Sequence, residues 1–334
     1  MITDAQKKLI EDASSIVVMQ AENPDGDSLG SALALEDILS EMGKKVTLYA
    51  HVDMPKYLRY VPGWDRVTAD FDTHADLAII VDTTSDTLLS KAMSSRNIRH
   101  FLETHPVLVF DHHGEVASTL DFEHELVIDP DSVATGEMIY QMAAANKWTI
   151  TPAGAEALMM AILSDSLGLT TAGTTARSIH TVASLVEIGA KPAEVEARRR
   201  LLMKKSPEIL EYKGVLIGRI EYFLEGKLAL IHIPWEDIQA YSDQYNPSVL
   251  VLDEMRLVEG VQVAIALKTY PDNKVTGKLR TNLPVADAIA GYFGGGGHVY
   301  AAGFRVYEAY DQVVRELVTA VSKILEDAEH DQTA

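Results

Sequence analysis

The chain has 334 residues, too many for one typical core, and its 47% hydrophobic and 23% charged residues exclude a wholly disordered or fibrous protein. It has no cysteine, which excludes disulfides, zinc fingers, iron–sulfur clusters and thiol nucleophiles. With 29 basic and 49 acidic residues, its formal net charge is −20, which disfavours binding to long double-stranded nucleic acid.

The first half of the sequence alternates short apolar runs with helical patterns. Strands are predicted at residues 16–19, 45–50, 77–81 and 107–110, and helices at 28–42 and 153–163. Continuous apolar strands separated by helices indicate a parallel sheet that is covered on both faces. No stretch resembles a signal peptide or a membrane span, so we expect a soluble cytoplasmic protein without a membrane partner.

The pattern changes in the second half. Residues 187–208, with a glycine, a proline and two basic runs, are predicted to be a linker between a domain at 1–186 and a smaller one at 209–330. Strands are then predicted at 228–233, 261–268 and 274–280, and helices at 285–292 and 309–328. The predicted fold is therefore an α/β domain with a parallel sheet, followed by an α+β domain with a mostly antiparallel sheet.

Acidic residues and histidines occur where the predicted parallel strands end. Asp25 and Asp27 follow the first strand, Asp82 follows the run 77–81, and Asp111, His112 and His113 follow the run 107–110. Because the carboxyl ends of parallel strands share one edge of a sheet, we expect these side chains to converge there. Asp165, at the end of a predicted helix, could complete the cluster.

Carboxylates in such numbers repel one another unless a cation neutralises them. Oxygen ligands with one imidazole favour Mn²⁺ or Mg²⁺, and Asp82, between the two clusters, is the natural bridging ligand of a metal pair. Asp25 or Asp27 alone would more simply cap the helix near Ser28. The recurrence of the pattern at three strand ends favours the metal site.

A glycine-rich loop marks the second half. Gly294–Gly297 precede His298, and small residues follow at 301–303. Four consecutive glycines suit a backbone that approaches an anion closely. We expect Gly295, Gly296, Gly297 and His298 to bind a substrate phosphate, together with Arg280 on the strand that leads to this region.

These residues together resemble the DHH phosphoesterase superfamily. The matching segments are 23–31 (NPDGDSLGS), Asp82, 111–113 (DHH), 132–137 (SVATGE), Asp165 and 293–304, the last of which resembles the GGGGH segment of the DHH-associated C-terminal domain. The resemblance spans residues 15 to about 325. Length and domain order are most similar to the nanoRNase/pAp phosphatase group, which degrades very short oligoribonucleotides and removes the 3′-phosphate from pAp.

The resemblance implies a hydrolase with two Mn²⁺ ions, or with Mg²⁺ or Co²⁺ in their place. One ion would be bound by Asp27, Asp82, His112 and Asp165, and the other by Asp25 and Asp82. Asp82 and Asp111 would belong to the catalytic centre, and His113 would lie beside the scissile phosphate. The expected substrates are short oligoribonucleotides, dinucleotides or pAp. A homodimer is compatible with the sequence.

One position departs from the family pattern. The first motif usually begins with a histidine three residues before its proline, and here that position is Ala21. Glu22 or Gln20 could substitute as a ligand, or the first metal could bind weakly. The alternative is a degenerate nucleotide-binding sensor with impaired hydrolysis. An inorganic pyrophosphatase is a third reading, which the GGGGH loop disfavours.

Overall fold

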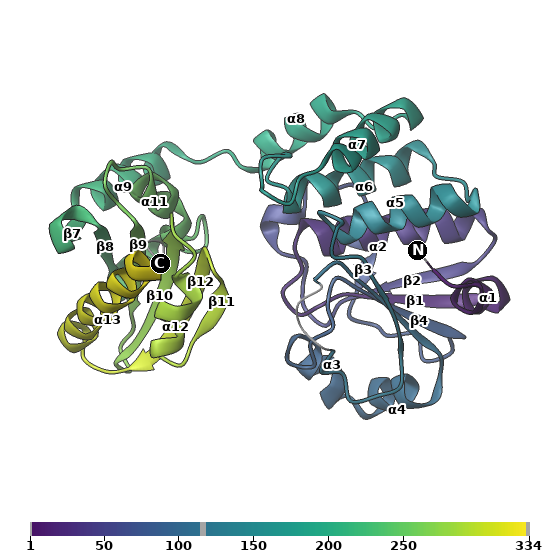
Figure 1. Ribbon diagram of the computed structural model, residues 1–334, viewed down its shortest axis with the longest axis horizontal. Helices are drawn as coiled ribbons and strands as arrows, with labels where there is room; N and C mark the ends of the chain where they lie inside the picture. Colours follow the sequence, from purple (N-terminus) through teal and green to yellow (C-terminus); the bar gives the residue numbers. More distant parts are fainter. Residues whose placement is uncertain (1, 114–117, 332–334) are drawn as a thin grey trace. The chain divides into compact units, whose positions relative to one another are not determined.

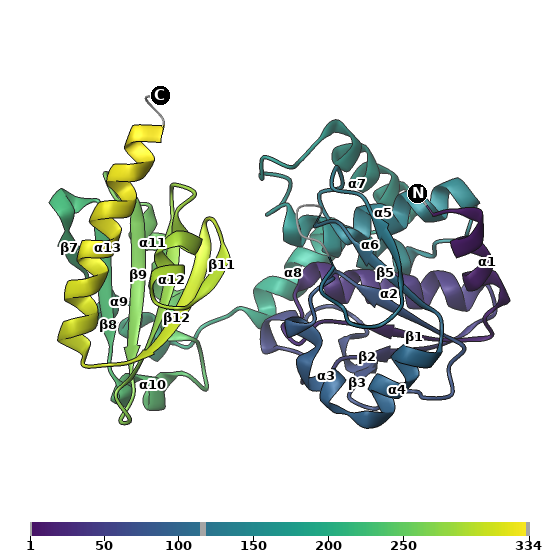
Figure 2. The same ribbon diagram turned by 60° about the horizontal axis from the view of Figure 1, so that its bottom comes forward.

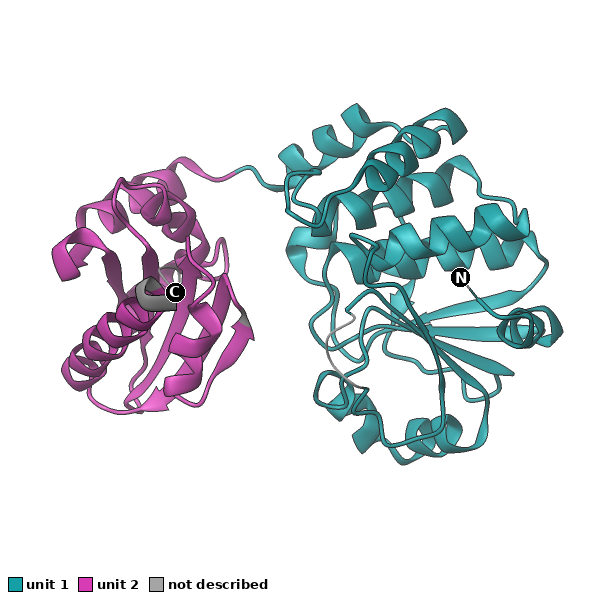
Figure 3. Cartoon of the chain, in the orientation of Figure 1, with its two compact units in different colours: residues 1–204 teal, residues 205–334 magenta. Residues whose placement is uncertain are grey.

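The computed structural model describes residues 2–113 and 118–331, and for His298 and residues 329–331 it describes only the backbone. The chain divides into two compact units, residues 1–204 and 205–334 (Figure 3). The division falls within the segment predicted as a linker. Part of that segment forms helix α8 (Pro192–Leu202), because Val195 packs into the core of unit 1 and Arg198 pairs with Glu156.

Unit 1 contains a six-stranded parallel sheet in the order β3-β2-β1-β4-β5-β6 (Figure 1). Its strands are β1 (Ser15–Met19), β2 (Lys45–Tyr49), β3 (Val67–Thr68), β4 (Leu77–Val81), β5 (Val107–Asp111) and β6 (Glu125–Ile128). The four central strands are the predicted ones. The short edge strands β3 and β6 carry no comparable apolar run. The predicted parallel sheet is confirmed.

Helices cover both faces of this sheet, which explains the continuous apolar strands. The helices are α1 (Asp4–Asp12), α2 (Gly26–Glu41), α3 (Ser90–Ser94), α4 (Arg96–Thr104), α5 (Thr135–Asn146), α6 (Pro152–Asp165) and α7 (Ala176–Ile188). Ile16 and Val18 of β1 pack on the side of α2, α5 and α6, whereas Val17 and Met19 pack on the side of α3 and α4.

Helices α2 and α6 approach each other closely because glycines lie at their contact. A Cβ atom on Gly30 would lie 2.5 Å from the carbonyl oxygen of Ala157 and 2.9 Å from the amide nitrogen of Ala161. Both atoms belong to the backbone of α6, so neither can move aside as a flexible side chain could. This contact brings the start of α2 beside the end of α6.

We expect Gly30→Ala to lower the free energy of unfolding by about 2–3 kcal/mol, because the added methyl group forces two packed helices apart. Gly214→Ala is the matched control, since Gly214 lies in a helix of unit 2 and its Cβ would have no neighbour within 4 Å. That control should stabilise its helix by about 0.5–1 kcal/mol. Urea denaturation followed by circular dichroism measures both; equal effects would contradict the packing argument.

Unit 2 has a mixed six-stranded sheet in the order β11-β12-β10-β9-β8-β7, in which only β8 and β9 pair in parallel (Figure 2). Its strands are β7 (Glu221–Phe223), β8 (Leu228–Ile233), β9 (Val263–Thr269), β10 (Lys274–Thr281), β11 (Gly296–His298) and β12 (Ala301–Tyr307). The sheet agrees with the predicted α+β fold of the second domain.

The helices of unit 2 lie on the two faces of its sheet. They are α9 (Pro207–Gly218), α10 (Trp235–Tyr241), α11 (Pro247–Arg256), α12 (Ala286–Tyr292) and α13 (Tyr310–Asp331). Ile265 and Leu267 of β9 pack toward α12 and α13, whereas Ala264 and Ala266 pack toward α9 and α11. Among the described residues, no helix is both long and apolar enough to cross a membrane.

Candidate metal centre

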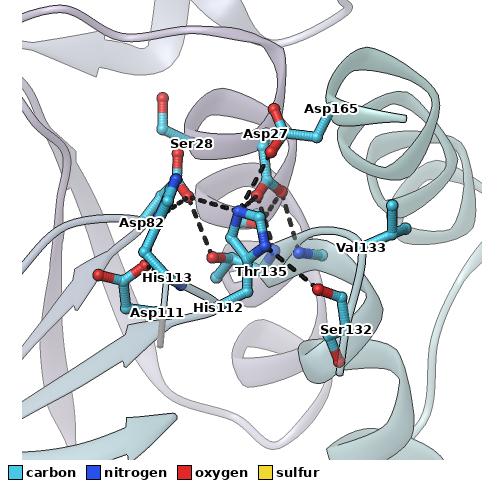
Figure 4. A network of polar contacts seen from close by, with 12 residues as sticks. Asp27, Ser28, Asp82, Asp111, His112, His113, Ser132, Val133, Thr135 and Asp165 are labelled. Carbon is cyan, nitrogen blue, oxygen red and sulfur yellow. Dashed lines mark hydrogen bonds and ion pairs between the residues drawn. The ribbon is translucent and has the colours of Figure 1, made fainter. Parts of the chain in front are cut away.

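The predicted acidic residues and histidines converge at the carboxyl edge of the sheet in unit 1 (Figure 4). Asp82 follows β4 directly, and His112 and His113 follow Asp111, the last residue of β5. Asp27 lies in the first turn of α2, and Asp165 is the last residue of α6. Four elements that are distant in sequence thus contribute to one cluster.

The imidazole of His112 lies at the centre of this cluster. Its Nε2 atom is 3.1 Å from Oδ2 of Asp165, 3.8 Å from Oδ2 of Asp27 and 3.8 Å from Oδ1 of Asp82. This atom is buried and makes no well-formed hydrogen bond within the described part of the chain. The other ring nitrogen, Nδ1, lies 3.2 Å from the carbonyl oxygen of Ser132, which fixes the ring orientation.

Asp27 is fully buried at the amino end of helix α5. Its carboxylate accepts hydrogen bonds from the amide N–H groups of Thr135 (2.7 Å) and Gly136 (3.0 Å). The hydroxyl of Ser31 donates a third, at 3.1 Å. A helix amino terminus stabilises a carboxylate, so α5 holds this side chain in place.

Asp82 has an unusual backbone conformation, with φ of 63°, which side-chain-bearing residues rarely adopt. Its amide donates to the carbonyl oxygen of Phe110, and its Oδ1 accepts from the Thr135 hydroxyl at 3.1 Å. Such strain persists where the surrounding structure requires a particular side-chain direction. Here that direction is toward the centre of the acidic cluster.

Thr135 is a site residue that sequence reasoning did not single out, because only the resemblance of segment 132–137 pointed to it. Within that segment Glu137 is fully buried, accepts from the Val133 amide and the Ser178 hydroxyl, and pairs with Arg177 of α7. Arg177 also donates to the Ser132 hydroxyl at 2.9 Å. Helix α7 therefore supports the loop that orients His112.

His113 lies at the exposed side of the cluster. Its Nδ1 is 2.7 Å from Oδ1 of Asp111, and its amide donates to the same oxygen. Asp111 is itself buried, and burial raises its pKa, but the bonds from His113 outweigh that effect and lower it. Asp111 and His113 thus form a carboxylate–imidazole unit beside the predicted metal ligands.

Asp25 caps helix α2, as the simpler reading of its position indicated. Its Oδ1 accepts from the amides of Asp27 and Ser28, each at 3.0 Å. Its predicted role as a metal ligand would use the remaining carboxylate oxygen and stays a prediction.

The surroundings of Ala21 indicate which neighbouring side chain could replace the histidine ligand that is absent at this position. Ala21 is buried, and the carboxylate of Glu22 accepts from the Lys91 amide and contacts the Ser90 hydroxyl, which ties it to the segment 88–91. The amide group of Gln20 is buried, and neither of its polar atoms has a hydrogen-bond partner among the described residues. Of the two flanking side chains, only Gln20 is uncommitted.

Burial and mutual repulsion destabilise the ionised form of the carboxyl groups in this cluster. Burial, with the charge of Asp165, raises the pKa of Asp27 to about 6. Burial and the carboxylates of Asp27 and Asp25 raise the pKa of Asp82 well above its usual range. Burial lowers the pKa of His112, but contact with Asp165 and the charge of Asp27 outweigh it and raise the pKa to about 9.

The donor atoms fit a hard divalent cation. One donor atom each from Asp27, His112 and Asp165 lies within 4.8 Å of the others, and the same holds for Asp82, His112 and His113. The two groups share His112. Three carboxylates around one imidazole nitrogen are ligands that Mn²⁺ or Mg²⁺ accepts, and a cation there would relieve the repulsion between the carboxylates.

The predicted phosphate-binding residues lie in unit 2. Gly295 and Gly297 approach β12 so closely that a Cβ atom would lie 2.2 Å from the Gly303 oxygen and 2.6 Å from the Ala301 oxygen, respectively. These two glycines are therefore required by packing, whereas Gly296 faces open space. Arg280 on β10 donates to the carbonyl oxygen of Leu279. The side chain of His298 lies outside the described residues.

Two known proteins are similar in sequence to this chain over nearly its whole length. A bifunctional oligoribonuclease and PAP phosphatase NrnA from Thermus thermophilus is 30% identical over 306 residues, which cover 89% of this chain and 88% of that protein. The Bacillus subtilis protein of the same name is 20% identical over 311 residues, 91% of this chain and 94% of that one.

A crystal structure of an exopolyphosphatase-related protein from Bacteroides fragilis covers 99% of this chain and 97% of its own, with a TM-score of 0.83 and 20% identity. It shares the fold. The family model "DHH family, N-terminal domain" matches residues 15–162, the segment that contains Asp27, Asp82 and the Asp111–His113 sequence. With near full-length similarity at 30% identity, this chain belongs to the DHH family of phosphoesterases.

Proposed function

We propose that this chain is a metal-dependent phosphoesterase that hydrolyses short oligoribonucleotides or small nucleotides such as pAp and dinucleotides. The observation that carries the proposal is the buried Nε2 of His112, which makes no well-formed hydrogen bond in the described structure and lies 3.1–3.8 Å from the carboxylates of Asp27, Asp82 and Asp165. The substrate class is taken from the two relatives similar over nearly the whole chain.

In this proposal, Asp27, Asp82, His112 and Asp165 hold one Mn²⁺ ion, and Asp25 and Asp82 hold a second. Bound divalent cations would neutralise phosphate charge and acidify an attacking water. Asp111 fixes the His113 ring through Nδ1, and His113 lies beside the scissile phosphate. In unit 2, Arg280, His298 and the backbone at Gly295–Gly297 bind a substrate phosphate.

The test is hydrolysis by the purified full chain with Mn²⁺, measured as phosphate released from pAp and mononucleotide released from pApA. We expect turnover that excess EDTA abolishes. Absence of turnover on both substrates, together with measurable nucleotide binding, would contradict the proposal and favour the sensor function. Ala21 and the commitment of Glu22 to the segment 88–91 are the observations that favour that second function.

We expect Ala21→His to lower the Mn²⁺ concentration that gives half-maximal activity by about tenfold, because it restores a nitrogen donor at the position where the family pattern has a histidine, and metal affinity already changes about 10–100-fold when groups beyond the direct ligands are replaced. Ala21→Leu is the control, since it adds bulk at this buried position without a nitrogen donor. Activity and Mn²⁺ binding by calorimetry are measured for both. If Ala21→His changes neither the Mn²⁺ affinity nor the Mn²⁺ dependence of activity, another side chain already serves as the missing metal ligand. Gln20 is then the first residue to replace by mutation.

A further inference from the structure

Two exposed apolar side chains of unit 1 adjoin the loop that carries Asp25. Tyr57 belongs to the short 3-10 helix Lys56–Leu58 and is 50% exposed. Leu167 follows the carboxyl end of α6 and is 70% exposed, more than any other large hydrophobic residue in the described part of unit 1. We call these two residues the apolar pair. A single exposed apolar residue is ordinary, but these two are held in fixed positions beside the candidate metal centre.

Tyr57 is fixed against the first loop of the candidate metal centre. Its hydroxyl donates a hydrogen bond of 3.0 Å to the carbonyl oxygen of Pro24, the residue before Asp25. The neighbouring Leu58 is buried in the core of unit 1, which anchors the 3-10 helix. Burial and the charge of Asp25 raise the pKa of the Tyr57 hydroxyl, so it remains a donor. The ring is therefore held at its hydroxyl end, while half of the residue stays exposed.

Leu167 lies in a strained turn directly after the carboxylate of Asp165. Leu167, Gly168 and Leu169 have φ values of 48°, 75° and 69°, in the left-handed region that favours glycine. Ser166 holds this turn, because its hydroxyl donates to the preceding turn of α6 and accepts from the Leu169 amide. Glycine is the usual residue where a helix ends in this conformation, and an exposed leucine gains no burial in return. Neither packing nor backbone preference therefore accounts for Leu167.

The turn at Leu167 and the ring of Tyr57 adjoin the same loop. A Cβ atom on Gly26 would lie 2.2 Å from the Oγ atom of Ser164, so the loop 24–26 packs directly against the end of α6. The Leu167 amide donates to the carbonyl oxygen of Ser164. Tyr57 reaches the same loop through its hydroxyl. The apolar pair therefore lies beside the carboxylates that we assign to the two cations.

We propose that the apolar pair binds the base of a nucleotide whose phosphate lies at the candidate metal centre. The base of a nucleotide is one ribose away from its phosphate, so a surface for the base must lie beside the cations. Aromatic rings stack on the faces of bases, and such contacts tolerate every base. Tyr57 would supply the stacking face and Leu167 a further apolar contact. This assignment rests on the proposed function only because it places a phosphate at the candidate metal centre.

The first experiment compares the affinities of AMP and ribose 5-phosphate for the full chain at saturating Mn²⁺, measured by calorimetry. The two ligands share the ribose and the phosphate and differ in the base. We expect wild-type protein to prefer AMP by about tenfold or more, as is typical when one base stacks on an aromatic ring. Tyr57→Ala should remove most of that preference and Leu167→Gly should reduce it about threefold. Both variants should keep the wild-type affinity for ribose 5-phosphate.

Tyr57→Phe and Tyr222→Ala are the controls for Tyr57. The first keeps the ring and loses the hydroxyl, so it should keep most of the preference for AMP. The second removes an equally exposed tyrosine, on β7 at the edge of the unit 2 sheet, and should leave the preference unchanged. Wild-type protein that binds AMP no more tightly than ribose 5-phosphate, or Tyr57→Ala protein that keeps the full preference, would overturn the proposal.

Melting temperatures separate a binding role of Leu167 from a structural one. Leu167→Gly removes a side chain from a left-handed residue, so it should raise the melting temperature while weakening the preference for AMP. Leu257→Gly is the matched control, because Leu257 is 77% exposed and also ends a helix, but its φ is −86°. That change should lower the melting temperature and leave the preference for AMP unchanged. Leu167→Gly protein that loses stability and keeps the preference would contradict the assignment of this residue.

Turnover of pAp and pApA is measured separately on the same proteins. A wild-type chain that hydrolyses these substrates but shows no preference for AMP would overturn only the apolar pair as a base-binding surface. A wild-type chain without turnover, whose preference for AMP is lost in Tyr57→Ala, would overturn the proposed hydrolysis and support the base-binding surface. The two failures are therefore distinguishable.

Discussion

Replacing Asp82 by asparagine is expected to abolish Mn²⁺-dependent hydrolysis, with a loss of kcat/KM on the order of 1000-fold or more. Asp82 is the carboxylate assigned to both cations. Stabilisation of the transition state by bound metal ions is worth several kcal/mol, and each 1.4 kcal/mol corresponds to about a tenfold change in rate. The backbone strain at this residue shows how narrowly its side chain is directed. The measurement is the initial rate on pAp and pApA at saturating Mn²⁺.

The matched control is Asp121→Asn, which makes the same chemical change at an exposed carboxylate that pairs with Arg99. It should retain near wild-type activity. The melting temperature of Asp82→Asn in EDTA should equal or exceed that of the wild type, because the change removes a buried charge among like charges. A fully active Asp82→Asn protein would remove this residue from the catalytic centre.

The second large effect concerns stability against pH. Without metal, folded-state pKa values above the unfolded ones are found for Asp27, Asp82 and His112. These three groups therefore bind more protons in the folded protein than in the unfolded chain between about pH 4 and 9, and the stability that they contribute falls as pH rises through this range. At about 1.4 kcal/mol per pKa unit, the loss is on the order of several kcal/mol.

Saturating Mn²⁺ should reverse this trend, since a bound cation replaces the protons and favours the ionised carboxylates. Melting temperatures at pH 5 and pH 8.5, with EDTA and with Mn²⁺, measure both effects. Asp82→Asn should weaken the pH dependence in EDTA. If the metal-free wild type is as stable at pH 8.5 as at pH 5, the cluster does not carry its charges in the described geometry.

The sequence predicts the central sheet well, because residues 77–81 and 107–110 are buried on both faces and read as continuous apolar runs. The convergence of Asp27, Asp82 and His112 was predictable for the same reason, since parallel strands end at one edge. The basic run at 198–200 is compatible with a solvated helix face, as helix α8 has, but the packing of Val195 into the core of unit 1 was not predictable from a segment with so few apolar residues facing one side.

The contacts that support the candidate metal centre were less visible in the sequence. Thr135 contributes a backbone N–H and a hydroxyl, and every residue type except proline can supply the first. The tie between Glu22 and Lys91 joins residues 69 apart, which no local pattern reveals. The glycines at 295 and 297 suggested an anion site, whereas their closest neighbours are backbone atoms of β12.

The link from Arg177 through Ser132 to His112 has a consequence for the timing of folding. During synthesis, the Asp27, Asp82 and His112 segments emerge well before Asp165 and helix α7. An emerging chain of 150 residues therefore lacks both the last carboxylate and the helix that orients the imidazole. Contacts between such distant segments form late in folding. High-affinity cation binding at the candidate metal centre should therefore also be a late event. Metal affinity would then report that unit 1 has completed its folding.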